Sequence, residues 1–202
     1  MSKLINNNLE EKGLEDLVDK VEIISENENI KSRNIFLVII KEWVTPILIA
    51  ILAAIFIKKY LMFTVYIPSG SMIPTLNIDD RLVVTKVYNP ENLERQDIVV
   101  FKSEELNEVL IKRLIGLPGD KVSIINGTVF INGEELQEDY VKNNDNFSGE
   151  FTVPDGEYFF LGDNRRESRD GREWKNPTIE AEDIIGKAQI KIFPFSDIGW
   201  IK

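Results

Sequence analysis

The chain has 202 residues, 43% of them hydrophobic, which is enough for one medium domain plus an anchor or for two small domains. Its net charge of -10 provides no basic face for phosphate contacts, so we expect no nucleic-acid partner. Cysteine and histidine are absent, which excludes disulfides, thiol nucleophiles, Ser-His-Asp triads and HExxH metal sites. Acid–base chemistry must therefore fall to Lys, Asp, Glu or Tyr.

Residues 1–34 are polar, with five Lys or Arg against eight Asp or Glu. Leu14, Leu17, Val21 and Ile24 recur at helical spacing. We expect a solvated tail that is either disordered or forms a short amphipathic helix.

An apolar stretch over 35–57 comes next, and only Lys41 and Glu42 within it are charged. As a helix rising ~1.5 Å per residue it reaches about 34 Å, enough to cross a ~30 Å hydrocarbon core. We predict a transmembrane anchor over 35–59, in preference to a buried core helix or a cleaved signal peptide. Three flanking Lys or Arg on one side against two on the other leave its orientation open.

Beyond the anchor, short runs rich in β-branched and aromatic residues are separated by turn signals. Asn126-Gly127 joins two of these runs and is the strongest short-range hairpin signal in the chain. We expect an exposed loop between Lys142 and Gly149. Residues 60–202 are predicted to form one mainly antiparallel β domain. The predicted strands cover 61–67, 81–87, 97–102, 109–116, 122–125, 128–131, 157–161 and 187–193.

Lys112 lies in the predicted strand VLIKRLIG, where alternation places it on the same face as Leu110 and Leu114. Desolvation there would lower its pKa, which is what a lysine needs to act as a general base. The alternative is a lysine at a sheet edge whose ammonium stays in water. Arg113 would point to the opposite, apolar face and require a carboxylate, for which the polar run 162–172 offers candidates.

The segment IPSGSMIPTL, residues 67–76, carries two hydroxyls around a glycine. Ser71 could attack a carbonyl while its own N–H points at the developing oxyanion, and the Ser69 hydroxyl is placed to be a second donor. The alternative is a Ser/Gly/Pro-rich turn that leaves the anchor. Ser71 lies 12 residues beyond Lys59, so it is at most about 40 Å from the bilayer. A nucleophile held there suits a substrate that is itself in the membrane.

Four segments, in order, resemble the conserved boxes of the bacterial type I signal peptidases, which are Ser/Lys-dyad endopeptidases. IPSGSMIPTL (67–76) is similar to the nucleophile box, and DRLVVTKV (80–87) to the strand after it. IKRLIGLPGDKV (111–122) resembles the lysine box, and GDNRRESRDGR (162–172) the last box. The similarity covers roughly residues 40–200. It implies an antiparallel β catalytic domain of the signal-peptidase type, in the compact form of Gram-positive relatives.

The resemblance implies that Ser71 is the nucleophile and Lys112 the general base, with no metal or cofactor. The Ser69 hydroxyl and the Ser71 amide would form the oxyanion hole. Ser168 would hydrogen-bond and orient the Lys112 amine. Supporting ion pairs around the site would come from Asp163, Asp170, Arg113 and Arg172. The pockets for substrate residues −1 and −3 would be lined by Ile67 and Ile111.

The resemblance implies a membrane-bound serine endopeptidase that removes N-terminal signal peptides from exported preproteins, cutting after small residues at sites of the A-x-A type. Its partners would be signal-peptide-bearing preproteins and the lipid bilayer, with the N-terminus cytoplasmic and the domain 60–202 outside. One alternative is a catalytically inactive signal-peptidase-like assembly factor, but such a protein would lack Ser71 or Lys112. Others are a self-cleaving Ser/Lys regulator, which would have no anchor, and a membrane-tethered β receptor domain.

Overall fold

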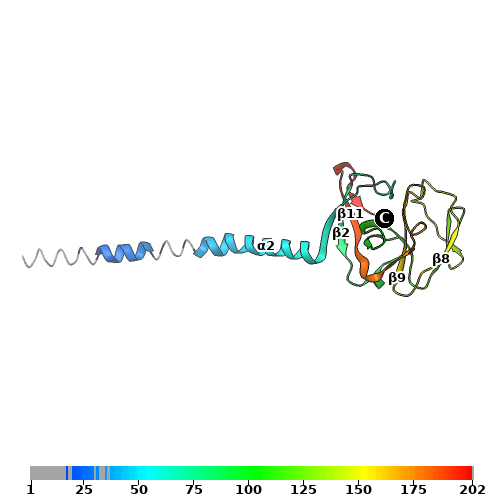
Figure 1. Cartoon of the computed structure of the whole chain (residues 1–202). Coiled ribbons are helices and arrows are strands. Elements are labelled where there is room, and N and C mark those ends of the chain that lie inside the picture. The colour runs from blue at the N-terminus through cyan, green and yellow to red at the C-terminus, as the bar shows by residue number, and fades with distance from the viewer. Residues whose placement is uncertain (1–16, 18–19, 30, 32–34, 36, 202) are drawn as a thin grey trace, which may run out of the picture. The chain divides into compact units, whose positions relative to one another are not determined.

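The chain separates into two compact units, Met1–Phe56 and Ile57–Lys202, in the computed structural model (Figure 1). In the first unit, residues 20–29 are helical, and Leu17 and Val21 of the predicted apolar stripe are exposed. Leu14 of that stripe lies outside the described residues. The structure describes residues 17, 20–29, 31, 35 and 37–201.

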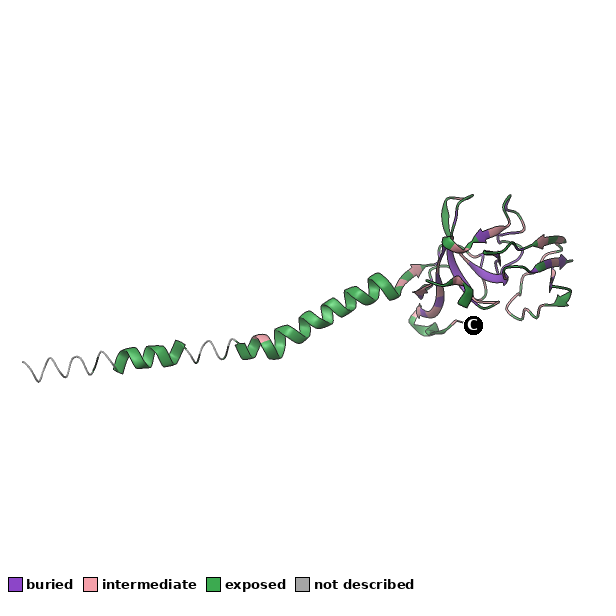
Figure 2. Ribbon diagram, turned by 90° about the horizontal axis from the view of Figure 1, so that it is seen from below, coloured by how far each residue is buried: buried purple, intermediate pink, exposed green. Residues whose placement is uncertain are grey.

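A continuous helix over Leu37–Leu61 is long and apolar enough to span a membrane. It contains α2 (Thr45–Phe56), flanked by the π-helical turns η1 (Ile40–Val44) and η2 (Ile57–Leu61). None of the side chains of α2 is buried (Figure 2), which argues against the core helix of a soluble protein. The helix includes most of the predicted span and extends to Leu61, which the sequence pattern had assigned to the first strand.

Two side chains from the β domain satisfy the end of this helix. Lys86 Nζ donates a hydrogen bond to the carbonyl of Lys59 at 2.8 Å, and the Tyr88 hydroxyl donates to the carbonyl of Tyr60 at 2.5 Å. The last carbonyls of a helix have no intrahelical partner, so these bonds stabilise the helix end. The chain then enters strand β1 (Met62–Tyr66) without a linker.

The larger sheet is antiparallel at every pairing and has the strand order β1-β2-β11-β3-β4-β9-β10, with β12 paired to β11. Short 3-10 turns connect some of its strands: η3 (Pro90–Asn92), η4 (Ala181–Asp183) and η5 (Phe195–Asp197). Its strands after β1 are β2 (Arg81–Lys86), β3 (Ile98–Ser103), β4 (Glu108–Gly116), β9 (Glu157–Leu161), β10 (Thr178–Glu180), β11 (Ile184–Phe193) and β12 (Gly199–Trp200).

A smaller antiparallel sheet has the order β7-β6-β5-β8. Asn126 and Gly127 have φ angles of 49° and 82°, as a two-residue turn of type I′ requires, so the predicted hairpin is confirmed. The strands that the pattern missed in the two sheets, β7, β8, β10 and β12, are only two to four residues long. The small sheet comprises β5 (Lys121–Ile125), β6 (Thr128–Ile131), β7 (Glu134–Glu135) and β8 (Gly149–Thr152).

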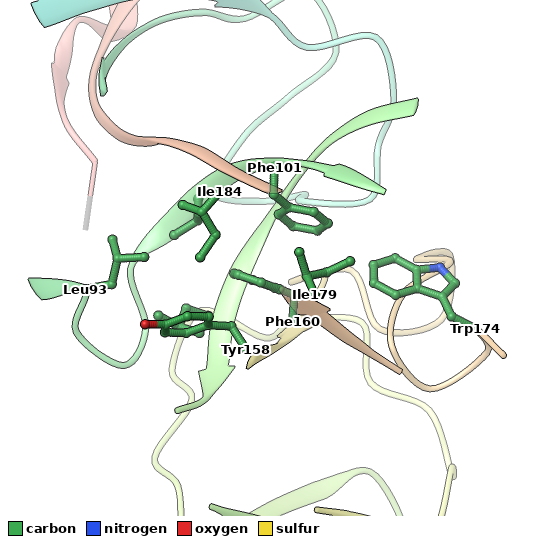
Figure 3. Close-up of a cluster of buried hydrophobic side chains, with 9 residues drawn as sticks. Leu93, Phe101, Tyr158, Phe160, Trp174, Ile179 and Ile184 are labelled. Atoms are coloured by element: carbon green, nitrogen blue, oxygen red, sulfur yellow. The ribbon is translucent and has the colours of Figure 1, made fainter. Parts of the chain in front are cut away.

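Buried apolar side chains form three groups in the β domain. In the first, Phe101 stacks on Phe160 with ring centroids 4.4 Å apart, and Trp174 meets Phe101 edge-on at 6.1 Å (Figure 3). The second group holds Met72 and Leu76 from the segment after β1. The third joins the two sheets through side chains of β4, β5, β6 and β9. The prediction of a mainly antiparallel β fold is therefore confirmed.

Candidate active site

Ser71 lies in the turn that joins β1 to β2. Met72 and Leu76 of this turn are fully buried, and Leu76 N donates to the carbonyl of Met72 at 2.9 Å. Ile67 at the start of the turn is bonded to the residues before β2, through Ile67 N to Asp80 O at 3.0 Å. Burial of two large side chains next to Ser71 therefore holds the serine in place.

Lys112 lies in the middle of β4, opposite Val99 of β3. Its Nζ is 2.6 Å from Ser71 Oγ, and the exposed fractions of the two residues are 4% and 9%. Burial lowers the pKa of Lys112 to about 8, although the carboxylates of Asp170 and Asp163 act in the opposite direction. Lys112 is therefore not a solvated lysine at a sheet edge. A buried amine of lowered pKa beside a serine hydroxyl is suited to act as its general base.

A groove of about 420 Å³ opens beside this pair. It is lined by the end of β1, the following turn and β4, and its lining includes Ile67, Ile111, Ser69, Ser71 and Lys112. Two apolar side chains and two serines thus share one groove with the amine. The groove is of a size that holds a few side chains of an extended peptide.

Arg113 follows Lys112 on β4 and is paired with Asp163. Its Nε and Nη2 donate to the two carboxylate oxygens at 2.8 and 2.6 Å, and both side chains are almost completely buried. The pairing follows from register, because Arg113 lies opposite Leu161 and the chain leaving β9 delivers Asp163 beside it. Arg113 Nη2 also lies 3.4 Å from Thr75 Oγ1, so Lys112 and Arg113 both reach the turn that carries Ser71.

Asp170 and Arg172 form the second buried ion pair, with Arg172 Nε donating to Asp170 Oδ1 at 2.8 Å. Asp170 Oδ2 also accepts from Gly162 N at 2.9 Å, which closes the segment 162–172 into a compact loop. Arg172 bonds in addition to Asp145, a residue of the loop that the sequence pattern predicted to be exposed. That prediction was incomplete, because Asp145 is half-buried by its contact with the site.

Ser168 is buried, and its Oγ has no hydrogen-bond partner among the described residues. The structure thus lacks the bond to the Lys112 amine that the resemblance implies. Ser168 Oγ instead lies against Gly162: a Cβ placed on Gly162 would be 2.1 Å from it. The amine of Lys112 is bonded to Ser71.

Gly162 is expected to tolerate no side chain, because the same Cβ would also be 2.6 Å from the carbonyl oxygen of Ser71. We expect Gly162→Ala to displace the Ser71 turn and to lower kcat by roughly tenfold to a hundredfold, since small misplacements of reacting groups have effects of this size. Gly199→Ala is the matched control, because nothing lies within 4 Å of its Cβ position. Wild-type kcat in Gly162→Ala, measured on a peptide substrate, would contradict this prediction.

Several polar residues of the site were not singled out from the sequence. Asn164 binds backbone of the Ser71 turn, and Arg165 Nη2 pairs with Glu138 at 2.5 Å. The ring of Tyr140 lies 3.8 Å from the Arg113 guanidinium carbon. Asn164 and Arg165 are part of the segment that resembles the last box, so that resemblance was the available signal. Glu138 and Tyr140 lie in a loop and had no signal in the sequence, because polar residues are common in any loop.

Comparisons with known proteins identify relatives of this chain. Residues 40–193 match the family model described as signal peptidase, peptidase S26. A probable signal peptidase I-2 of Synechocystis sp. is 39% identical over 158 residues, covering 74% of this chain and 72% of that protein. A signal peptidase I of Bacillus licheniformis is 37% identical over 169 residues, covering 78% of this chain and 90% of that protein. The crystal structure of a signal peptidase I from Enterococcus faecalis V583 is 35% identical and aligns with a TM-score of 0.42, covering 48% of this chain and 96% of that one.

The family match spans most of the β domain and includes Ser71, Lys112 and the segment 162–172. The relatives' identities extend over more than two thirds of their own lengths. On these grounds the chain belongs to the signal peptidase family, peptidase S26.

Proposed function

We propose that this chain is a signal peptidase I that removes signal peptides from preproteins, with Ser71 as nucleophile and Lys112 as general base. The observation that carries the assignment of roles is the 2.6 Å contact between Lys112 Nζ and Ser71 Oγ, buried beside an open groove. An inactive assembly factor would have no use for this pair. The names of the relatives, signal peptidase I, support the same reaction.

In the first half of the reaction, the neutral Lys112 amine takes the proton of the Ser71 hydroxyl, and Oγ bonds to the scissile carbonyl carbon. The oxyanion that forms would accept hydrogen bonds from the Ser71 N–H and the Ser69 hydroxyl. When the C–N bond breaks, the Lys112 ammonium returns its proton to the leaving amine. The mature protein departs with a new N-terminus, and the signal peptide remains as an ester on Ser71.

In the second half, Lys112 is neutral again and takes a proton from a water molecule that attacks the ester. The C–Oγ bond breaks, Ser71 recovers its proton from Lys112, and the signal peptide leaves with a free carboxylate. Two ion pairs have a structural role only, because they hold the segments that carry the reacting groups. These are the pairs of Arg113 with Asp163 and of Arg172 with Asp170.

Small residues at −1 and −3 of the cleavage site would occupy the part of the groove lined by Ile67 and Ile111. Ile67 is 1% exposed and is held by backbone bonds on both sides, so the pocket has little freedom to widen. A rigid apolar wall favours short apolar side chains such as alanine over long or charged ones. This supports cleavage of the A-x-A type.

The helix Leu37–Leu61 would anchor the enzyme in the lipid bilayer as a single-pass protein. We propose that the N-terminal tail is cytoplasmic and that the β domain, which begins directly at Met62, lies outside. In this arrangement Ser71 is close to the surface where signal peptides emerge, since only a short strand and turn separate it from the helix end.

The pH dependence of cleavage tests the role of Lys112. Below its pKa of about 8 the amine is protonated and cannot accept the Ser71 proton. We therefore expect kcat/KM to rise about tenfold per pH unit in the acidic range and to level off above about pH 8. The measurement is cleavage of a preprotein with an Ala-x-Ala site between about pH 6 and 10.

The control for this profile is enzyme held at each pH and then assayed at pH 9, which separates titration from irreversible unfolding. A flat profile between mildly acidic and alkaline pH, with full recovery in the control, would contradict a lysine base. A self-cleaving regulator would cut its own chain and leave the preprotein intact. Gel analysis of the same samples would distinguish these two outcomes.

A further inference from the structure

Asn164 holds both peptide groups that flank Ser71. It is 3% exposed, and its side-chain Nδ2 donates to the carbonyl of Gly70 at 2.9 Å. Its backbone N–H donates to the carbonyl of Ser71 at 3.0 Å. One residue of the segment after β9 thus bonds both to the peptide before the serine and to the peptide after it.

The bond to the Gly70 carbonyl has a consequence for the Ser71 N–H. The peptide between Gly70 and Ser71 is planar and, being trans, directs its C=O and its N–H to opposite sides. Holding the Gly70 oxygen against Asn164 therefore directs the Ser71 N–H to the other side of the plane. That N–H is the backbone donor of the oxyanion hole in the proposed function, and such a donor acts only when it is 2.7–3.1 Å from the oxyanion.

A glycine at 70 makes this restraint necessary. Gly70 has more accessible backbone conformations than any other residue type, so the adjoining peptide plane is free to rotate unless a bond holds it. Ser69 before it is exposed and provides no packing. Within the turn, Ile73 N donates to the Gly70 carbonyl at 3.2 Å. The shorter bond from Asn164 adds a second restraint on this peptide from outside the turn.

The amide of Asn164 is itself oriented by Asn143. Asn143 Nδ2 donates to Asn164 Oδ1 at 2.6 Å, which leaves Asn164 Nδ2 facing the Gly70 carbonyl. The backbone carbonyl of Asn143 accepts from Arg166 N at 3.2 Å, so the loop is also attached to the same segment by its main chain. Glu167 Oε2 is a second, longer acceptor for Asn164 Nδ2 at 3.3 Å.

The loop that carries Asn143 is braced by the small sheet. Asn144 Nδ2 donates to the carbonyl of Gly127 at 3.2 Å, and Gly127 N donates to the carbonyl of Phe147 at 2.9 Å. A Cβ on Gly127 would be 2.2 Å from the carbonyl oxygen of Asp145, so the Asn-Gly hairpin fits closely under the loop. The small sheet therefore provides a rigid base for Asn143.

We propose that Asn164 is a positioning residue for the oxyanion hole, and that Asn143 acts through Asn164 by fixing the direction of its amide. The inference rests on the proposed role of the Ser71 N–H. It assigns to the loop between β7 and β8, and to the small sheet under it, a part in transition-state stabilisation without any contact to the substrate.

The test is steady-state cleavage of a peptide substrate by the full-length chain in detergent micelles. We expect Asn164→Ala to lower kcat on the order of 10²-fold and Asn143→Ala to lower it roughly tenfold, since loss of one oxyanion donor has effects of the former size. KM should stay near the wild-type value, because the oxyanion exists only in the transition state. The midpoint of the pH profile should also stay in place, because neither amide bonds to Lys112.

Two further variants make the test specific. Asn143→Asp presents an acceptor to Asn164 Oδ1 and favours rotation of that amide, which would point Oδ1 at the Gly70 carbonyl; we expect it to lower kcat more than Asn143→Ala does. Asn146→Ala is the matched control, because Asn146 is an exposed residue of the same loop and should show wild-type kcat. Melting temperatures of all variants identify any that fail to fold, and the Asn143 variants decide the question if Asn164→Ala is one of them.

The double variant Asn143→Ala/Asn164→Ala should have the same kcat as Asn164→Ala alone, because Asn143 acts only through Asn164. Losses that multiply would overturn the relay, as would wild-type kcat in both single variants. Ser71→Ala, assayed alongside, separates the two levels of the argument. If Ser71→Ala is active, the proposed function is wrong; if it is inactive while the asparagine variants are normal, only the positioning role is wrong.

Discussion

Replacing Ser71 by alanine, or Lys112 by methionine, is expected to abolish cleavage of a preprotein with an Ala-x-Ala site. In serine hydrolases that use a Ser-His-Asp triad, loss of the nucleophile or of its base lowers kcat by about 10⁴–10⁶-fold. We expect losses of that order here. Methionine is the informative replacement for Lys112, because it has a similar length and no proton-accepting amine. It should leave the fold intact, since it removes a buried polar group rather than adding one.

Two matched variants control this experiment. Lys102→Ala removes an exposed lysine from the adjacent strand β3, and Ser123→Ala removes a partly buried serine from β5. Both should cleave at the wild-type rate. Wild-type activity in Ser71→Ala or in Lys112→Met would rule out the Ser/Lys pair. A loss of activity accompanied by a large fall in melting temperature would point to misfolding instead. Lys112→Arg, which keeps a charged side chain at this position, would then distinguish misfolding from loss of the base.

Replacing Asp163 by asparagine is expected to lower the free energy of unfolding by about 3–5 kcal/mol, because it leaves the Arg113 guanidinium buried without a charged partner. The side chains of this pair are 1% and 0% exposed, so solvent cannot compensate. Thr75 Oγ1 also donates to Asp163 at 2.5 Å, which links the pair to the Ser71 turn. Activity should therefore fall together with stability.

The measurement is the melting temperature of the full chain in detergent, where a loss of this size corresponds to a decrease on the order of 10 °C. Glu150→Ala is the control: it removes an ion pair with Lys121 whose side chains are 67% and 59% exposed. Exposed pairs contribute about 0–1 kcal/mol, so its melting temperature should change by no more than a few degrees. Equal changes in the two variants would contradict the argument.

Local patterns were sufficient for most of the fold. The apolar span, the alternation in β4 and the Asn126-Gly127 turn are each set by interactions between residues near in sequence. The strands that escaped prediction, such as β8 and β10, are short and gain their order from pairing with a neighbouring strand. Strand pairing of that kind depends on register across the sheet, which no local pattern contains.

The catalytic candidates were predictable to different degrees. Lys112 was singled out because a lysine between two leucines is costly unless it is used, and because the chain has no histidine. Ser71 by itself was a serine in a turn after an anchor. What distinguished it was the resemblance to the signal peptidases and, in the structure, its 2.6 Å contact with the amine. The predicted bond from Ser168 to Lys112 is absent from the described residues.

By itself, then, the sequence determined the apolar span, the antiparallel β class and the family, and it singled out Ser71 and Lys112 as catalytic candidates. Only the tertiary structure showed which polar side chains bond to the Ser71 turn. Asn143 and Asn164 are 21 residues apart, and 94 residues separate Asn164 from Gly70. Polar residues of loops have no periodicity that marks a partner at such distances. Their bonds arise only when the packing of two sheets brings the loops together, which is why the supports of the Ser71 turn could not be predicted from the sequence.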